Sequence, residues 1–187
     1  MFTRAFSARS INYTLITHGI GIDEPLIMQR DLDLSGTFEQ AENFFYHTDG
    51  LGSIIDITDN TGSIVQSYVY DSFGNIVLSN GSLENFYTYT GREFDAESGL
   101  YFYRARYYDP TLGRFLQEDS LGFVDGFNRY NYVSNNPINY ADPSGLISLS
   151  EQYLTYLMIF FVSTTYISTY YKKNGLNSGA DFPTRLI

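Results

Sequence analysis

The chain has 187 residues, of which 43% are hydrophobic and 17% charged, as in a globular protein with a core of its own. Its net charge of −10 argues against a nucleic-acid-binding surface, which needs clustered Lys and Arg. The absence of Cys excludes disulfides and thiolate nucleophiles, and two His are too few for a His-rich metal cluster. Eighteen Tyr and 15 Phe with no Trp favour strands, so we expect an all-β fold.

The first 19 residues, MFTRAFSARSINYTLITHG, do not have the pattern of an export signal. Arg4, Arg9 and several hydroxyl side chains interrupt the apolar residues. A signal peptide needs an uninterrupted apolar core of about 7 to 15 residues. We therefore expect no signal peptide in this chain, and we assign residues 1–43 to the end of a preceding repeat region.

A repeated turn motif organises the next part of the chain. Asp is followed three residues later by Gly, and an apolar residue comes two residues after the Gly, at Asp49, Asp59, Asp71, Asp119 and Asp142. Asp and Gly at these positions favour a type I turn, because Asp bonds nearby amides and Gly tolerates positive φ. TDNTGSIV and YDSFGNIV repeat the motif within strand-like surroundings. We predict antiparallel hairpins from about Phe44 to Phe115.

The remaining sequence divides into two segments. Residues 116–146 carry DSLG, NNP and DPSG and predict a loop-rich cap. Residues 147–187 form a tail in which 152–171 contain no charge, and Ser148 and Glu151 have the spacing of a helix capping box. We expect the tail to be hydrophobic and partly helical.

Four stretches together resemble the RHS repeat-associated core, the end of a Tyr-Asp (YD) repeat shell. They are YHTDGLGS, YVYDSFGN, YTGREFDAESGLYFYRARYYDPTLGRF and NRYNYVSNNPINYADPSGL. This family includes polymorphic toxins of bacterial competition, and the resemblance implies antiparallel hairpins that form the end of a hollow β-shell. On this basis residues 44–146 are the core with its DPxGL motif, and residues 147–187 are a variable cargo or its remnant.

The resemblance also implies self-cleavage by an aspartic-protease-like site directly after DPxGL. The matching positions are Arg106, Asp119 and Asp142, and the bond to be cleaved joins Leu146 to Ile147. Two close carboxylates cannot both ionise cheaply, so one Asp can act as an acid beside a basic partner. Arg106 can position a carboxylate or stabilise the developing oxyanion. The chemistry would be that of an autoprotease acting once, without cofactor or metal.

Simpler interpretations remain open for the same residues. Asp142 and Asp119 fit the repeated turn without any chemistry, and Arg106 fits an ion pair on a strand. The family usually has Asp-Pro where this chain has Asp119-Ser120, which removes a rigid ring from the turn. Glu118 is a substitute acid beside Asp119.

Three function classes follow. The first is the self-cleaving plug of a toxin-delivery shell, the second a YD-repeat scaffold or cell-surface binding module, and the third a displaced, inactive tip. The expected partners are an upstream shell on the same or a separate chain and a cognate immunity protein for the tail, with no nucleic acid. Residues 152–171 fit a membrane span, a segment packed inside the shell, or a decayed remnant. The resemblance implies a secreted or cell-envelope location.

Overall fold

A computed structural model describes residues 3–7, 13–21, 23–31, 37–38, 43–122 and 127–150. Its largest element is an antiparallel seven-stranded sheet in which the strands pair in chain order. These strands are β1 (Thr3–Ser7), β2 (Tyr13–His18), β3 (Pro25–Arg30), β4 (Asn43–Thr48), β5 (Ile54–Asp59), β6 (Ile64–Tyr70) and β7 (Ile76–Gly81). Strand β3 pairs directly with β4, with Met28 opposite Phe44. Strands on both sides of the expected boundary at residue 43 therefore belong to one sheet.

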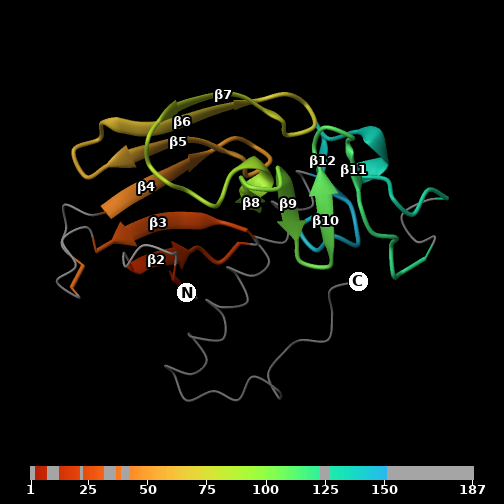
Figure 1. Cartoon of the computed structure of the whole chain (residues 1–187), viewed down its shortest axis with the longest axis horizontal. Coiled ribbons are helices and arrows are strands. Elements are labelled where there is room, and N and C mark those ends of the chain that lie inside the picture. Colours follow the sequence, from red (N-terminus) through yellow and green to blue (C-terminus); the bar gives the residue numbers. More distant parts are fainter. Residues whose placement is uncertain are drawn as a thin grey trace, which may run out of the picture.

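Two smaller sheets and two 3-10 turns complete the described fold. The four-stranded sheet has the order β11-β10-β9-β8, formed by β8 (Glu93–Asp95), β9 (Leu100–Tyr103), β10 (Arg106–Asp109) and β11 (Arg114–Phe115). Strands β12 (Tyr140–Ala141) and β13 (Leu149–Ser150) form a third sheet, and the 3-10 turns are η2 (Tyr89–Gly91) and η3 (Val133–Asn135). Figure 1 shows β8 to β11 at one end of the stacked strands β2 to β7. The all-β prediction is confirmed.

The five Asp-x-x-Gly motifs form the turns that the sequence predicts. In each turn the Gly amide donates to the carbonyl of the Asp three residues earlier, over 3.0 to 3.2 Å. Every one of these Gly residues has positive φ, between 71° and 89°. The turns are at Asp49, Asp59, Asp71, Asp119 and Asp142.

Tyrosines join the two main sheets. The ring of Tyr101 is fully buried among other aromatic side chains of the second core, and its hydroxyl donates to the Gly74 carbonyl over 2.7 Å. Tyr108 donates to the Phe73 carbonyl over 2.7 Å, in the same β6–β7 turn. Because these hydroxyls are buried with partners, the aromatic residues can fill the core without leaving polar groups unsatisfied. The tyrosines therefore also form a hydrogen-bonded link between the two main sheets.

Of the predicted tail, the structure describes only residues 147–150. Leu149 pairs with Ala141 as part of a β-ladder, so a helix does not begin directly after Ser148 as the capping-box spacing suggested. The pairing with β12 supplies strand partners at these positions, and this outweighs a local capping signal. Residues 151–187, including the apolar stretch 152–171, lie outside the described part of the chain. Within the described residues, no helix has the length and apolar character to cross a bilayer.

Candidate functional site

Three separate elements bring Arg106, Asp119 and Asp142 together. Arg106 begins β10, Asp119 opens the turn that follows β11, and Asp142 directly follows β12. All three are buried, with only 3%, 4% and 1% of their surfaces exposed. Buried charges are rare unless they are paired, so this grouping sets these residues apart from the exposed turn aspartates.

The Arg106 guanidinium contacts both carboxylates. Its Nη2 is 3.1 Å from Asp119 Oδ2 and 3.3 Å from Asp142 Oδ2. Its Nη1 donates to the Arg129 carbonyl over 3.0 Å, and its Nε donates to the Gly145 carbonyl. The guanidinium also lies 3.7 Å from the centre of the Phe115 ring. Planar packing and several hydrogen bonds fix its orientation.

Asp142 connects this cluster to the bond between Leu146 and Ile147. Its Oδ1 accepts hydrogen bonds from both the Leu146 and the Ile147 amides, each over 3.0 Å. The Ser144 hydroxyl donates to the same oxygen over 3.0 Å. One carboxylate oxygen therefore faces Arg106, and the other contacts the nitrogen of the bond expected to break. Ile147 is 43% exposed, so this bond lies where the buried site meets solvent.

Burial raises the pKa of the Asp142 carboxyl above its ordinary value of 3.8. Hydrogen bonds from the Ile147 and Leu146 amides and from Ser144, together with the Arg106 charge, lower the pKa but do not outweigh burial. The protonated form of Asp142 is thus favoured by desolvation. From the sequence we expected mutual repulsion of the two carboxylates to raise this pKa, but burial is the main cause, and both carboxylates contact the Arg106 guanidinium.

The turn at Asp142 packs closely on the β9–β10 connection. Gly145 has a φ of +71°, and a Cβ on this residue would lie 2.2 Å from the Tyr103 carbonyl oxygen. Only glycine accommodates both the positive φ and this close approach of two backbones. The Gly of DPSGL therefore lets the turn reach the Arg106 side chain.

Arg129 is a part of the site that the sequence analysis missed. Its Nη2 donates to the Asp119 carbonyl over 2.6 Å, and the Asp119 amide donates back to the Arg129 carbonyl over 2.9 Å. Arg129 also pairs with Glu118 over 2.5 Å, and Glu118 is half exposed. Glu118 therefore has its own partner outside the Arg106 cluster. No motif marks Arg129, because its contacts are to backbone groups brought near only by folding.

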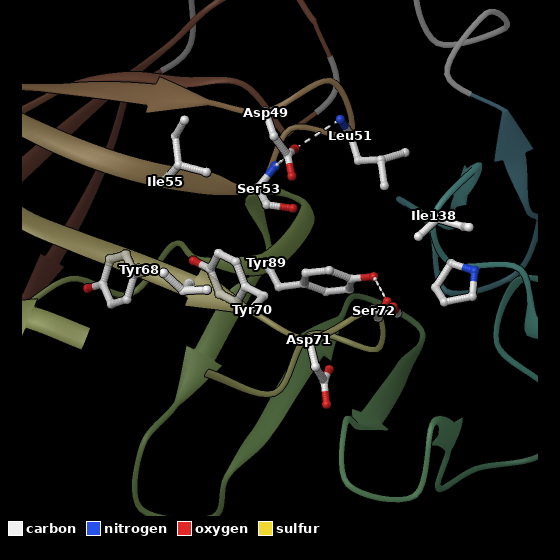
Figure 2. A pocket seen from close by; sticks show the side chains of 12 residues that line it. Asp49, Leu51, Ser53, Ile55, Tyr68, Tyr70, Asp71, Ser72, Tyr89 and Ile138 are labelled. Carbon is white, nitrogen blue, oxygen red and sulfur yellow. Dashed lines mark hydrogen bonds between the residues drawn. The ribbon is translucent and has the colours of Figure 1, made fainter. Parts of the chain in front are cut away.

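A separate pocket of about 440 Å³ lies between two hairpin turns and the segment near Ile138. Figure 2 shows Tyr70 and Tyr89 within it, and Asp49 and Asp71 on opposite sides of these rings. Arg106, Asp119 and Asp142 do not line this pocket. It is a surface distinct from the carboxylate–guanidinium cluster.

The sequence was compared with models of known protein families. The sequence model of the family described as Teneurin YD-shell matches residues 13–138, about two thirds of the chain. The chain belongs to this YD-shell family. The resemblance inferred from the Tyr-Asp motifs is therefore confirmed, and the matched region contains strands β2 to β11 and two of the three clustered residues.

Relatives and solved structures extend well beyond the length of this chain. It is 42% identical over 111 residues to the tRNA nuclease WapA of Bacillus subtilis, covering 56% of this chain and 5% of WapA. It is 36% identical over 108 residues to the toxin protein Tse5 of Pseudomonas aeruginosa, covering 58% and 8%. A crystal structure of TcdB2-TccC3-Cdc42 is similar with a TM-score of 0.62 and 29% identity, covering 72% and 7%. The chain thus spans less than a tenth of these relatives.

Proposed function

We propose that this chain forms the closing end of a YD-repeat toxin-delivery shell and cleaves its own backbone between Leu146 and Ile147. The observation that carries the proposal is the double role of Asp142. One of its oxygens binds Arg106 beside Asp119, and the other accepts the amides on either side of the Leu146 carbonyl. A site that contacts both a carboxylate partner and a peptide bond has the components of hydrolysis.

Asp142 is the proposed acid. Burial shifts its pKa in the direction that makes protonation easier, and its Oδ1, which accepts the Ile147 N–H over 3.0 Å, lies within reach of that nitrogen. An amide nitrogen is weakly basic, but it becomes pyramidal and basic once water has added to the neighbouring carbonyl carbon. Proton transfer from Asp142 to this nitrogen would then let the bond to Leu146 break.

Asp119 is the proposed base. It would take a proton from the attacking water while the water oxygen bonds to the Leu146 carbonyl carbon. After the C–N bond breaks, Leu146 ends in a carboxyl group and Ile147 begins with an amine. One water molecule is consumed and no other reactant is needed.

Arg106 would hold the two acids in place. Its ion pair with Asp119 and its charge-assisted hydrogen bond to Asp142 hold the two acids, and its contact with the Gly145 carbonyl holds the chain just before the bond. Removing the guanidinium would leave Asp119 and Asp142 buried without this partner. We therefore assign Arg106 a positioning role.

Release of residues 147–187 is the proposed outcome. Tse5, a relative, is named as a toxin, and one similar crystal structure is titled TcdB2-TccC3 without hypervariable C-terminal region. By analogy, the partners would be upstream repeats and an immunity protein for the released tail, and the location would be secreted or cell-envelope associated. Cleavage would separate the shell end from its C-terminal segment.

A scaffold or binding module is the second candidate, and two observations favour it. Asp59 accepts amides two and four residues later in its turn, and Asp142 likewise accepts the amide four residues later, so its turn resembles the repeats that have no proposed chemistry. The pocket that contains Tyr70 and Tyr89 is a surface on which a ligand could bind. In this case the chain would stay intact.

Substitution of each acid by Asn tests the proposal. Asp119→Asn and Asp142→Asn remove the titrating group but preserve size, so each should abolish cleavage, observed as loss of the tail fragment by mass spectrometry. Asp59→Asn and Asp71→Asn are matched controls, because they occupy the same turn motif away from Arg106. Both controls should cleave like the parent.

Two results would count against the acid pair. Cleavage of Asp142→Asn at the parental rate would assign Asp142 to the turn alone. An equal defect in Asp59→Asn would indicate that turn stability, rather than the Asp119 and Asp142 carboxyls, controls the reaction.

A further inference from the structure

We propose that Asp23, in the loop between β2 and β3, positions the cleavage turn through Arg104 and makes cleavage depend on the docking of the β2–β3 hairpin. This inference rests on the proposed function. Asp23 is separated from Arg104 by 81 residues in sequence, and no local motif marks it. Its carboxylate nevertheless lies at the start of a chain of contacts that ends at the segment preceding Leu146.

The first step is that contacts with Arg92 and Gly91 fix the position of Asp23. Its side chain is only 8% exposed, and its Oδ1 is 2.6 Å from Arg92 Nη1. Its backbone has a φ of 56°, and a Cβ on Gly91 would lie 2.2 Å from the Asp23 carbonyl oxygen. A non-glycine residue at positive φ, packed this closely, is held by its surroundings.

The second step is the bidentate pair between Asp23 and Arg104. Arg104 Nη1 donates to Asp23 Oδ2 over 3.0 Å, and Arg104 Nη2 donates to Asp23 Oδ1. Arg104 is itself at positive φ, 54°, in the connection between β9 and β10. Two parallel hydrogen bonds orient the planar guanidinium as a single charge contact cannot.

The third step is a ladder from three consecutive residues to three consecutive carbonyls. Arg104 donates through Nη1 to the Pro143 carbonyl, and the Ala105 amide is 3.4 Å from the Ser144 carbonyl oxygen. Arg106 donates through Nε to the Gly145 carbonyl. The β9–β10 connection therefore holds the segment directly before Leu146 at each carbonyl in turn.

The ladder has one contact that depends on a distant element. Ala105 bonds through its backbone, and Arg106 is fixed by Asp119, Asp142 and Phe115. Arg104 is half exposed, and its carboxylate partner comes from the β2–β3 loop. An undocked hairpin would leave Arg104 without Asp23 and loosen the turn at Pro143. Cleavage would then await completion of the neighbouring repeats.

The test uses the full chain in two forms. In the parent, Asp23→Asn should lower the cleavage rate by about ten- to a hundred-fold, because small displacements of reacting groups cost rates of this size. In an Asp119→Asn chain, adding Asp23→Asn should speed hydrogen exchange at the Leu146 and Ile147 amides about ten-fold, as expected when a hydrogen bond to a charged group is lost. The Ile57 amide should exchange as before, which separates local positioning from general destabilisation.

Asp95→Asn is the matched control, because Asp95 accepts bonds from Glu97 and Ser98 in an exposed turn. It should leave both readouts unchanged. Arg104→Gln should also slow cleavage and speed exchange at Leu146 and Ile147. Because Asp23 pairs with Arg92 as well as with Arg104, the double variant should be no worse than Asp23→Asn alone.

The outcomes distinguish this inference from the proposed function. If Asp23→Asn speeds exchange at Leu146 and Ile147 but the parent chain never cleaves, the coupling is supported and self-cleavage is contradicted. A parent that cleaves, with Asp23→Asn showing parental rate and parental exchange, would overturn the coupling and leave self-cleavage standing. Additive effects of Asp23→Asn and Arg104→Gln, or equal acceleration at Ile57, would also overturn it.

Discussion

At the scale of single residues, Asp59 and Asp142 occupy the same position of the turn motif, but their pKa values are shifted in opposite directions. Asp59 is only partly buried, and the hydrogen bond from the Thr61 side chain is the main cause that lowers its pKa below 3.8. Asp142 occupies the same place in its turn, but burial raises its pKa above 3.8. The difference arises from the surroundings of the turn, since Asp142 lies against β10 and Asp59 faces solvent.

These shifts predict pH dependences of opposite sign. The raised pKa of Asp142 contributes stability that is fully present below the ordinary pKa and is lost as pH rises through the folded value. The lowered pKa of Asp59 contributes stability that is present above the ordinary pKa and is lost as pH falls through the folded value. Relative to the parent, Asp142→Asn should therefore gain stability with rising pH above 3.8, and Asp59→Asn should lose it with rising pH below 3.8.

Denaturant unfolding at a series of pH values measures both trends. An Asp119→Asn background would keep the chain intact under the proposed function, so all variants would be compared at equal length. Parallel pH profiles for Asp142→Asn and Asp59→Asn would contradict the assignment of opposite shifts.

At the scale of elements, the Asp142 turn depends on contact with the β9–β10 connection. Gly145→Ala should cost about 1 kcal/mol for positive φ, and overpacking against the Tyr103 carbonyl should add about 1 to 3 kcal/mol. Gly62→Ala is the control, since its φ is +83° and no atom lies within 4 Å of the added Cβ. Gly62→Ala should lose only the stability attributed to positive φ, about 1 kcal/mol. Chemical denaturation measures the two losses, and equal losses would refute the close docking of the turn.

Local sequence was enough to predict some elements and not others. The hairpins at Asp49, Asp59 and Asp71 are predictable because each turn is encoded by its own Asp and Gly. Strand β13 was missed because its pairing partner, Ala141, is defined by folding of the cap. A capping-box spacing alone cannot show that a strand partner is near.

The candidate site shows the same division. Arg106, Asp119 and Asp142 were named through family motifs, and the structure places them in one cluster. Arg129 and Asp23 escaped notice because each acts through contacts between distant segments, without a local pattern. The cause of the Asp142 pKa shift also required the structure, because burial depends on packing.

At the scale of the whole molecule, the large sheet has an edge strand on each side. The strand order runs from β1 to β7, so the outer edges of both strands are unpaired within the described residues. Val77 in β7 is 67% exposed. An open apolar edge recruits other chains through its free backbone groups. We expect the isolated chain to self-associate.

Val77→Lys should reduce this association, because a charge on an edge strand disfavours edge-to-edge pairing. Leu112→Lys is the control, since Leu112 is similarly exposed at 62% but lies in a turn between β10 and β11. Sedimentation velocity would follow the oligomer distribution. Equal improvement in both variants would point to net charge, and not the β7 edge, as the cause.

The most direct measurement for the central claim is the intact mass of the purified chain, taken alone and after mixing with upstream repeats on a second chain. We expect two fragments, one ending at Leu146 and one beginning ISLSEQYL, and a single intact mass for Asp142→Asn under the same conditions. Cleavage that appears only after mixing would attribute activity to completion of the shell. An intact parent in both conditions, or cleavage at a bond other than Leu146–Ile147, would contradict self-cleavage at this site.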